Sequence, residues 1–255
     1  MKTLTLVLFL LSACTGPPPI DTDGHTDVDT AWQRPAGGEI VMEMFDGITV
    51  PATYLSASRA GRPGLVLMHG GESFHDRTSW PPGLVSDLVE RDWAVLIPDM
   101  RGTGGSGGVA RDMLGGVGIQ DIKTYAGLLR DDGFGEIGLV TGTYVDGAVT
   151  AYLYQADRGQ QDVVPVAVGY LTSYGNHTEK LAQIDSLAVR PLLFQYHLNF
   201  KEWPRALQKR NPGPWRFIEY DGFLLDTGLF EQNPQAADDL VAFFDTVWPG
   251  DEGGD

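Results

Sequence analysis

The sequence predicts an α/β fold, with a mostly parallel eight-stranded sheet and helices on both of its faces. From residue 39 onward, short apolar runs alternate with segments of helical periodicity, which favours parallel strands joined by crossover helices. The runs at 64–68 and 93–98 are almost wholly apolar, as in strands that are buried on both faces. The dipeptide Asp46-Gly47 separates two strand-like segments and is a strong hairpin signal.

The individual elements follow from the same patterns. The predicted strands are 39–45, 48–55, 64–68, 93–98, 137–141, 164–171, 191–196 and 215–220. The predicted helices are 83–92, with Leu84, Leu88 and Val89 on one face; 119–129, with Ile119, Ile122, Ala126 and Leu129 on one face; and 147–155. A last helix takes Asn233 as N-cap and Pro234 in its first turn, and buries Ala237, Leu240, Val241, Phe244 and Val247.

Residues 1–13 are predicted to be the signal peptide of a bacterial lipoprotein. Lys2 precedes an apolar run at 4–11, which is too short to span a membrane. The tetrapeptide Leu11-Ser12-Ala13-Cys14 resembles a lipobox, and Cys14 is the single cysteine of the chain. The resemblance implies that an acylated Cys14 inserts into the lipid bilayer of the cell envelope. Thr15 after the cysteine favours the outer membrane under bacterial sorting rules. The alternative is a plain secretory signal with an incidental cysteine.

The rest of the chain divides into three parts. Residues 14–38 are rich in Pro, Gly, Asp and Thr and are predicted to be an acidic tether. Residues 39–248 form one domain, and 249–255 form an acidic tail. The formal net charge of −16 argues against nucleic acid as a partner, because phosphate binding requires clustered Lys and Arg. No cofactor motif is found in the sequence.

Three motifs resemble those of the α/β-hydrolase fold family over roughly residues 39–248. His69-Gly70-Gly71 is similar to the oxyanion loop of that family, which implies that the N–H of Gly71 faces an oxyanion site. The run from Asp99 through Arg101 to Ser106 resembles the family's D-x-R-G-x-G-x-S turn. The segment 137–154 resembles the strand, nucleophile elbow and helix. The resemblance implies an eight-stranded sheet with a short segment between 171 and 191, and so no large lid domain.

The elbow lacks the expected nucleophile. The family pattern is G-x-S-x-G-G, whose glycines allow a sharp turn. Matching the glycines of 142–147 puts Tyr144 at the serine position. Matching strand length instead puts Thr143 there, and a third register puts Val145 there. All three registers remain open from the sequence. Ser106 sits in a literal G-x-S-x-G match, but this match lies within the D-x-R-G motif, where the family uses the serine in a structural turn.

The other two triad positions are also substituted. By resemblance, the base should stand at 225, which is Leu225, and the acid at 200, which is Phe200. Loss of such a serine or histidine costs on the order of 10⁶ in turnover. We therefore expect no conventional Ser-His-Asp triad.

Relocated catalytic groups are the alternative. A relay from His197 or His75 to Thr143, with Asp226 as orienter, would restore a base and a nucleophile. His69, His75 and Asp76 also suggest a metal, but their spacing matches no known site. We therefore expect polar structural roles for these three residues and no metal.

Two functional hypotheses follow. The favoured one is a lipid-anchored α/β-hydrolase-fold protein without its triad, acting as a binding or scaffold module of the cell envelope. Its crevice, with Gly71, would hold a small acyl or carbonyl ligand without turning it over. The alternative is an active ester or amide hydrolase with a non-standard nucleophile, for which Thr143 is the fallback candidate.

Overall fold

The computed structural model describes residues 36–70, 75–171, 190–198, 201–210, 214–224 and 226–249. These residues belong to one compact unit, Trp32–Asp255. The predicted signal peptide, the tether up to residue 35 and the tail from residue 250 lie outside the described residues, as do Cys14, Gly71, Phe200 and Leu225.

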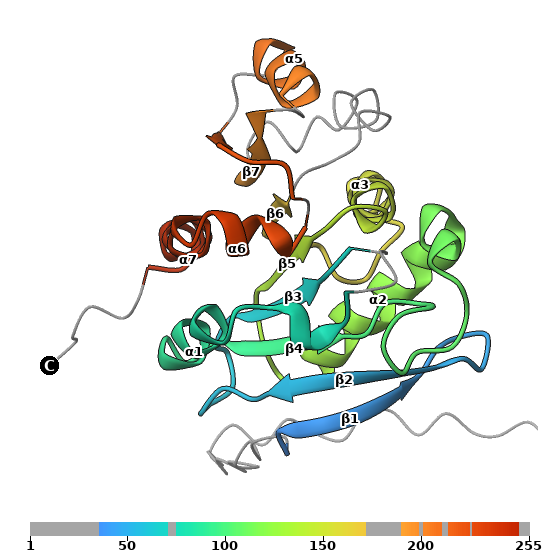
Figure 1. Ribbon diagram of the computed structural model, residues 1–255. Helices are drawn as coiled ribbons and strands as arrows, with labels where there is room; N and C mark the ends of the chain where they lie inside the picture. The colour runs from blue at the N-terminus through green and yellow to red at the C-terminus, as the bar shows by residue number, and fades with distance from the viewer. Residues whose placement is uncertain are drawn as a thin grey trace, which may run out of the picture. The chain divides into compact units, whose positions relative to one another are not determined.

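An eight-stranded sheet forms the centre of the fold, in the order β1-β2-β4-β3-β5-β6-β7-β8 (Figure 1). β1 pairs antiparallel with β2, β2 pairs antiparallel with β4, and the pairs from β4 to β8 are parallel. The predicted fold class is confirmed. The strands are β1 (Gly38–Glu43), β2 (Thr49–Leu55), β3 (Gly64–Met68), β4 (Ala94–Pro98), β5 (Ile137–Thr141), β6 (Ala167–Leu171), β7 (Leu192–His197) and β8 (Trp215–Tyr220).

Helices cover both faces of the sheet, as alternation along β3 shows. Val66 and Met68 pack in a core with α2 and α3, whereas Leu65 and Leu67 pack in a second core with α1, α6 and α7. Successive strand residues point to opposite faces, so the all-apolar sequence of β3 supplies both cores. The helices are α1 (Pro82–Glu90), α2 (Gly116–Asp131), α3 (Val145–Ala156), α5 (Glu202–Arg210), α6 (Gly228–Gln232) and α7 (Gln235–Val247), with 3₁₀ turns η1 (Arg77–Ser79) and η2 (Ala110–Leu114).

Several predicted boundaries are wrong for local reasons. β6 starts at Ala167 rather than at 164, because Pro165 has no N–H to donate to a strand ladder. Val89 is largely exposed, not buried with Leu84 and Leu88. The last helix takes Pro234 as N-cap, while the side chain of Asn233 donates to the carbonyl of Asp221.

Helix α2 also begins earlier than predicted, at Gly116, and α3 begins at Val145. The sequence did not predict α5 or α6. No helix among the described residues is both long and apolar enough to cross a bilayer.

Candidate functional site

The segment after β5 forms a tight strand-to-helix turn with Tyr144 at its apex. Tyr144 has φ 70° and ψ −33° and immediately precedes α3. The N–H of Gly142 donates to the carbonyl of Met68 in β3, and the N–H of Asp146 donates to the carbonyl of Gly142. We call residues 142–147 the elbow. Of the three registers left open by the sequence, the structure has the one that matches the glycines, with Tyr144 at the apex.

The apex conformation is unusual for a tyrosine. A positive φ favours glycine and costs other residues on the order of 1 kcal/mol or more. Tyr144 keeps 38% of its surface exposed. Backbone strain of this kind is concentrated at functional sites.

Thr143, the residue before the apex, turns away from solvent. It is 1% exposed, and its hydroxyl has no hydrogen-bond partner among the described residues. Val145, after the apex, is fully buried as the first residue of α3. No described side chain therefore activates the hydroxyl of Thr143. A hydroxyl without a base is a poor nucleophile.

The carboxylate of Asp226 packs against the elbow from a distant part of the chain. It is fully buried, it accepts the N–H of Thr143, and it lies directly against Gly70. A side chain at Gly70 would overlap this carboxylate, and one at Gly142 would meet the N of Gly70 at 2.6 Å and Oδ1 of Asp226 at 2.7 Å. Both glycines are therefore required by the close approach of Asp226.

The predicted relay from a histidine through Thr143 is not assembled. His197 ends β7 and is fully buried beside Gly222, and neither of its ring nitrogens has a hydrogen-bond partner among the described residues. Burial lowers the pKa of His197, with backbone groups of Asp221, Leu224 and Tyr220 acting in the opposite direction. Among the described residues, Asp226 accepts the N–H of Thr143, and the hydroxyl of Thr143 is hydrogen-bonded to neither His75 nor His197.

His69, in the loop after β3, has a structural environment. Its Nε2 accepts the N–H of Met100 at 3.1 Å, so the proton resides on Nδ1, which donates to the carbonyl of Gly70 at 2.6 Å. Burial lowers the pKa of His69 to about 4. The ring is therefore neutral near pH 7 and fastens the loop after β3 to the segment after β4.

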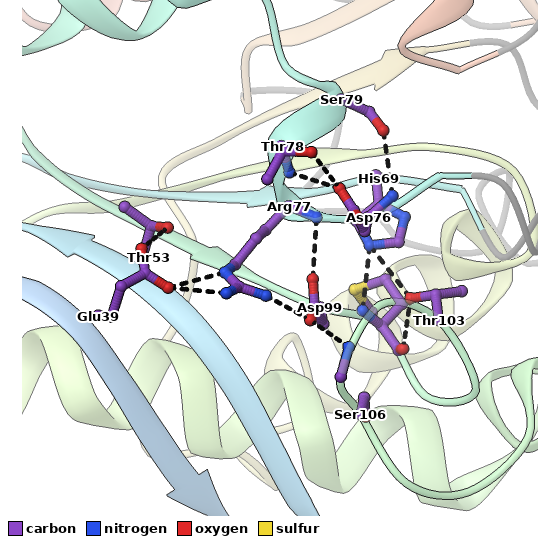
Figure 2. Close-up of polar contacts among 12 residues, drawn as sticks. Glu39, Thr53, His69, Asp76, Arg77, Thr78, Ser79, Asp99, Thr103 and Ser106 are labelled. Atoms are coloured by element: carbon purple, nitrogen blue, oxygen red, sulfur yellow. Dashed lines mark hydrogen bonds and ion pairs between the residues drawn. The ribbon is translucent and has the colours of Figure 1, made fainter.

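The turn after β4, residues 99–108, is held by a separate polar network (Figure 2). Asp99 accepts from the backbone and the guanidinium of Arg77, and from the N–H of Gly105. Asp76 caps η1 by accepting the N–H of Thr78 at 2.7 Å. Among the described residues, no three His, Cys, Asp or Glu side chains come together as a metal-binding group.

Arg101 of the same turn is completely buried between two carboxylates. It donates two hydrogen bonds to Asp121 and two to Asp46, at 2.6–3.0 Å. These bonds, chiefly those to Asp121, raise the pKa of Arg101, while burial raises the pKa of Asp121. The motif residues Asp99 and Arg101 hold the turn and β1–β2 hairpin together.

Ser106 lies in this turn and not at the elbow. Its hydroxyl donates to the carbonyl of Gly107 at 3.1 Å, and its N–H donates to the carbonyl of Thr103. No histidine ring approaches it within hydrogen-bond distance among the described residues. The sequence named Asp226 only as an orienter in a relay and did not predict its direct contact with the N–H of Thr143, which joins positions 83 residues apart.

Comparisons with solved structures agree with this architecture. An esterase from Pyrococcus furiosus is similar with a TM-score of 0.63 at 14% identity, covering 91% of this chain and 98% of that one. A predicted CIB-like hydrolase from Thermoplasma acidophilum gives 0.63 at 15% identity, covering 82% and 98%. An alpha-beta serine hydrolase homologue from Coxiella burnetii gives 0.58 at 12% identity, covering 80% and 95%. No protein-family model matches the chain.

At these identities the comparisons show the fold alone. The protein has the α/β-hydrolase fold, as its strand order also indicates.

Proposed function

We propose that this protein is a non-catalytic member of the α/β-hydrolase fold, which binds a small neutral carbonyl ligand at the elbow. The observation that carries the proposal is the pairing of Tyr144 at the apex with an adjacent Thr143 hydroxyl that has no hydrogen-bond partner in the described part of the chain. A serine-type mechanism needs a nucleophile within about 3.2 Å of a general base. The described elbow supplies neither a serine nor such a base.

The elbow offers hydrogen-bond donors without offering a nucleophile. The hydroxyl of Thr143 is buried and has no hydrogen-bond partner among the residues that the structure describes, and the N–H of Val145, in the first turn of α3, has no partner within the helix. Donors of this kind suit a carbonyl oxygen. The buried carboxylate of Asp226 beside Thr143 disfavours an anion there. A neutral ester, amide or ketone is therefore favoured over a free carboxylate.

Labelling with a fluorophosphonate probe, read by intact mass spectrometry, tests the absence of catalysis. We expect no adduct under conditions that fully label a control serine hydrolase. A stoichiometric adduct on Thr143, Tyr144 or Ser106 that disappears after heat denaturation would establish the alternative, an active hydrolase with a relocated nucleophile.

Ligand binding is tested with a medium-chain methyl ketone and the carboxylate of the same chain length, followed by NMR saturation transfer. We expect the ketone to bind more tightly, and Thr143→Val to weaken its binding about tenfold, because one buried hydrogen bond is lost. Thr150→Val is the matched control, since Thr150 bonds to Tyr170 within the core. Equal binding of ketone and carboxylate, or no effect of Thr143→Val, contradicts the carbonyl assignment.

We further propose that acylated Cys14 anchors the protein in the bacterial cell envelope, in the outer membrane. The lipobox-like sequence before this single cysteine supports the proposal. Labelled palmitate should enter the wild-type chain in bacteria and not Cys14→Ala, and the label should follow the outer-membrane fraction. Equal labelling of the two chains excludes Cys14 as the acylation site.

A further inference from the structure

The charge of this chain is unevenly distributed. The whole sequence has a formal net charge of −16, but residues 201–216 contain a single acidic residue, Glu202. The basic residues of that segment are Lys201, Arg205, Lys209, Arg210 and Arg216. A basic segment in a strongly acidic protein attracts a negatively charged surface locally, because charges further than about 8–10 Å away are screened at physiological salt.

This basic segment forms α5 and the start of β8, at the end of the sheet opposite β1 (Figure 1). Leu207 of α5 is fully buried in the core, whereas Lys209 and Arg216 are exposed. Arg205 is paired with Glu219 at 2.8 Å, which neutralises part of its charge. Among the described residues, no ion pair involves Lys201 or Lys209.

Two exposed apolar side chains accompany the cations. Leu198 is 39% exposed and Phe223 is 66% exposed. Leu198 follows His197 and Phe223 follows Gly222, and His197 pairs with Tyr220 and lies against Gly222, so both side chains belong to the same end of the β7–β8 pair. Large exposed apolar groups beside cations are typical of proteins that lie on a membrane, where the apolar groups enter the headgroup layer and the cations meet lipid phosphates.

We propose that this α5 edge, consisting of α5 with Lys201, Leu198 and Phe223, binds the surface of an anionic phospholipid bilayer. A bilayer fits better than a nucleic acid, because transfer of Leu198 and Phe223 from water into the membrane interface is favourable. The phosphate backbone of a duplex offers these side chains no apolar environment. The proposal does not depend on ligand binding at the elbow or on acylation of Cys14.

Sedimentation with vesicles tests the proposal, using the compact unit from Trp32 to Asp255, which lacks Cys14. We expect binding to vesicles of phosphatidylglycerol and phosphatidylcholine, weak binding to phosphatidylcholine alone, and a loss of binding as salt is raised. Lys201→Glu with Lys209→Glu should lower the partition coefficient at least about tenfold. Phe223→Ser should lower it by a smaller factor without changing the salt dependence.

Lys123→Glu on α2 is the matched control, because Lys123 is similarly exposed but lies on another helix and pairs with Asp162. Circular dichroism melts confirm that each variant is folded. Binding to anionic vesicles that is absent, or that Lys123→Glu and the α5 variants reduce equally, overturns the proposal. Salt-sensitive binding to duplex DNA without binding to vesicles also overturns it.

Hydrogen exchange of the full-length protein in the same vesicles provides a second readout. Amides of 198–210 and 216–224 should be protected in anionic vesicles relative to phosphatidylcholine, whereas those of α2 should not change. Protection of α2 with no protection of the α5 edge assigns the membrane contact elsewhere and contradicts the proposal.

Discussion

In the β4 turn, Arg101 makes four hydrogen bonds to Asp46 and Asp121, whereas at the elbow the hydroxyl of Thr143 makes none within the described residues. Both segments follow central strands of one sheet, and both carry buried polar groups. A buried polar network with all its partners rigidifies a fold. A buried donor without a partner is costly, and a ligand that accepts from it would remove that cost. The difference indicates that the β4 turn stabilises the protein. The proposed carbonyl ligand would supply the acceptor that the Thr143 hydroxyl lacks among the described residues.

The stabilising role of the β4 turn is tested most directly at Arg101. Arg101→Met should lower the free energy of unfolding by about 3–5 kcal/mol, because it leaves Asp121 as an unpaired carboxylate in the core. Urea denaturation measures the change. Arg101→Met with Asp121→Leu should recover most of the loss. A single variant that is as stable as the wild type contradicts the structural role of this network.

The second test concerns pH and His69. The pKa of His69 is lowered by burial to about 4, while an unfolded histidine has a pKa near 6.5. Between these values the unfolded state binds more protons, so stability falls as the pH drops from about 6.5 to 4, by about 3 kcal/mol. Urea unfolding at several pH values should show a weaker dependence for His69→Gln, whose amide can donate and accept. If the free energy of unfolding depends equally on pH in the wild type and in His69→Gln, His69 is not the cause of the pH dependence.

The close approach of Asp226 to Gly70 gives a third test. Gly70→Ala should destabilise the protein by about 2–3 kcal/mol, because the added methyl group overlaps the buried carboxylate. In an Asp226→Ala background the same substitution should cost much less, which a double-mutant cycle measures. Equal costs in the two backgrounds would mean that Asp226 does not lie against Gly70.

The smallest expected effect is at the apex and has the opposite sign. Tyr144→Gly should stabilise the protein by about 1 kcal/mol, since glycine adopts a φ of 70° without strain. Tyr154→Gly, within α3, is the matched control and should destabilise by about 1 kcal/mol. Thermal melts compare the two. If Tyr144→Gly is also destabilising, the phenol ring contributes more to the elbow than its exposure suggests.

The alternation of apolar strands and amphipathic helices was sufficient to predict a mostly parallel eight-stranded sheet, and the Asp99–Arg101 motif was sufficient to predict the β4 turn. Burial on both faces requires an apolar run such as 64–68, and an arginine fork has few partners other than carboxylates. Both features depend on residues close together in the sequence or on a residue type with few possible partners. The sequence by itself therefore determined the sheet and the β4 turn.

The arrangement of the elbow was decided by the tertiary structure alone. Three registers of 142–147 were equally compatible with the sequence, because the apex depends on where Gly142 bonds to Met68 of the neighbouring strand. The sequence placed Asp226 near Thr143 only as an orienter in a relay, and its direct bond to the Thr143 backbone, across 83 residues, had no local signal. Periodicity and motifs carry information about neighbours along the chain, whereas the position of a buried carboxylate depends on how the finished sheet brings its loops together.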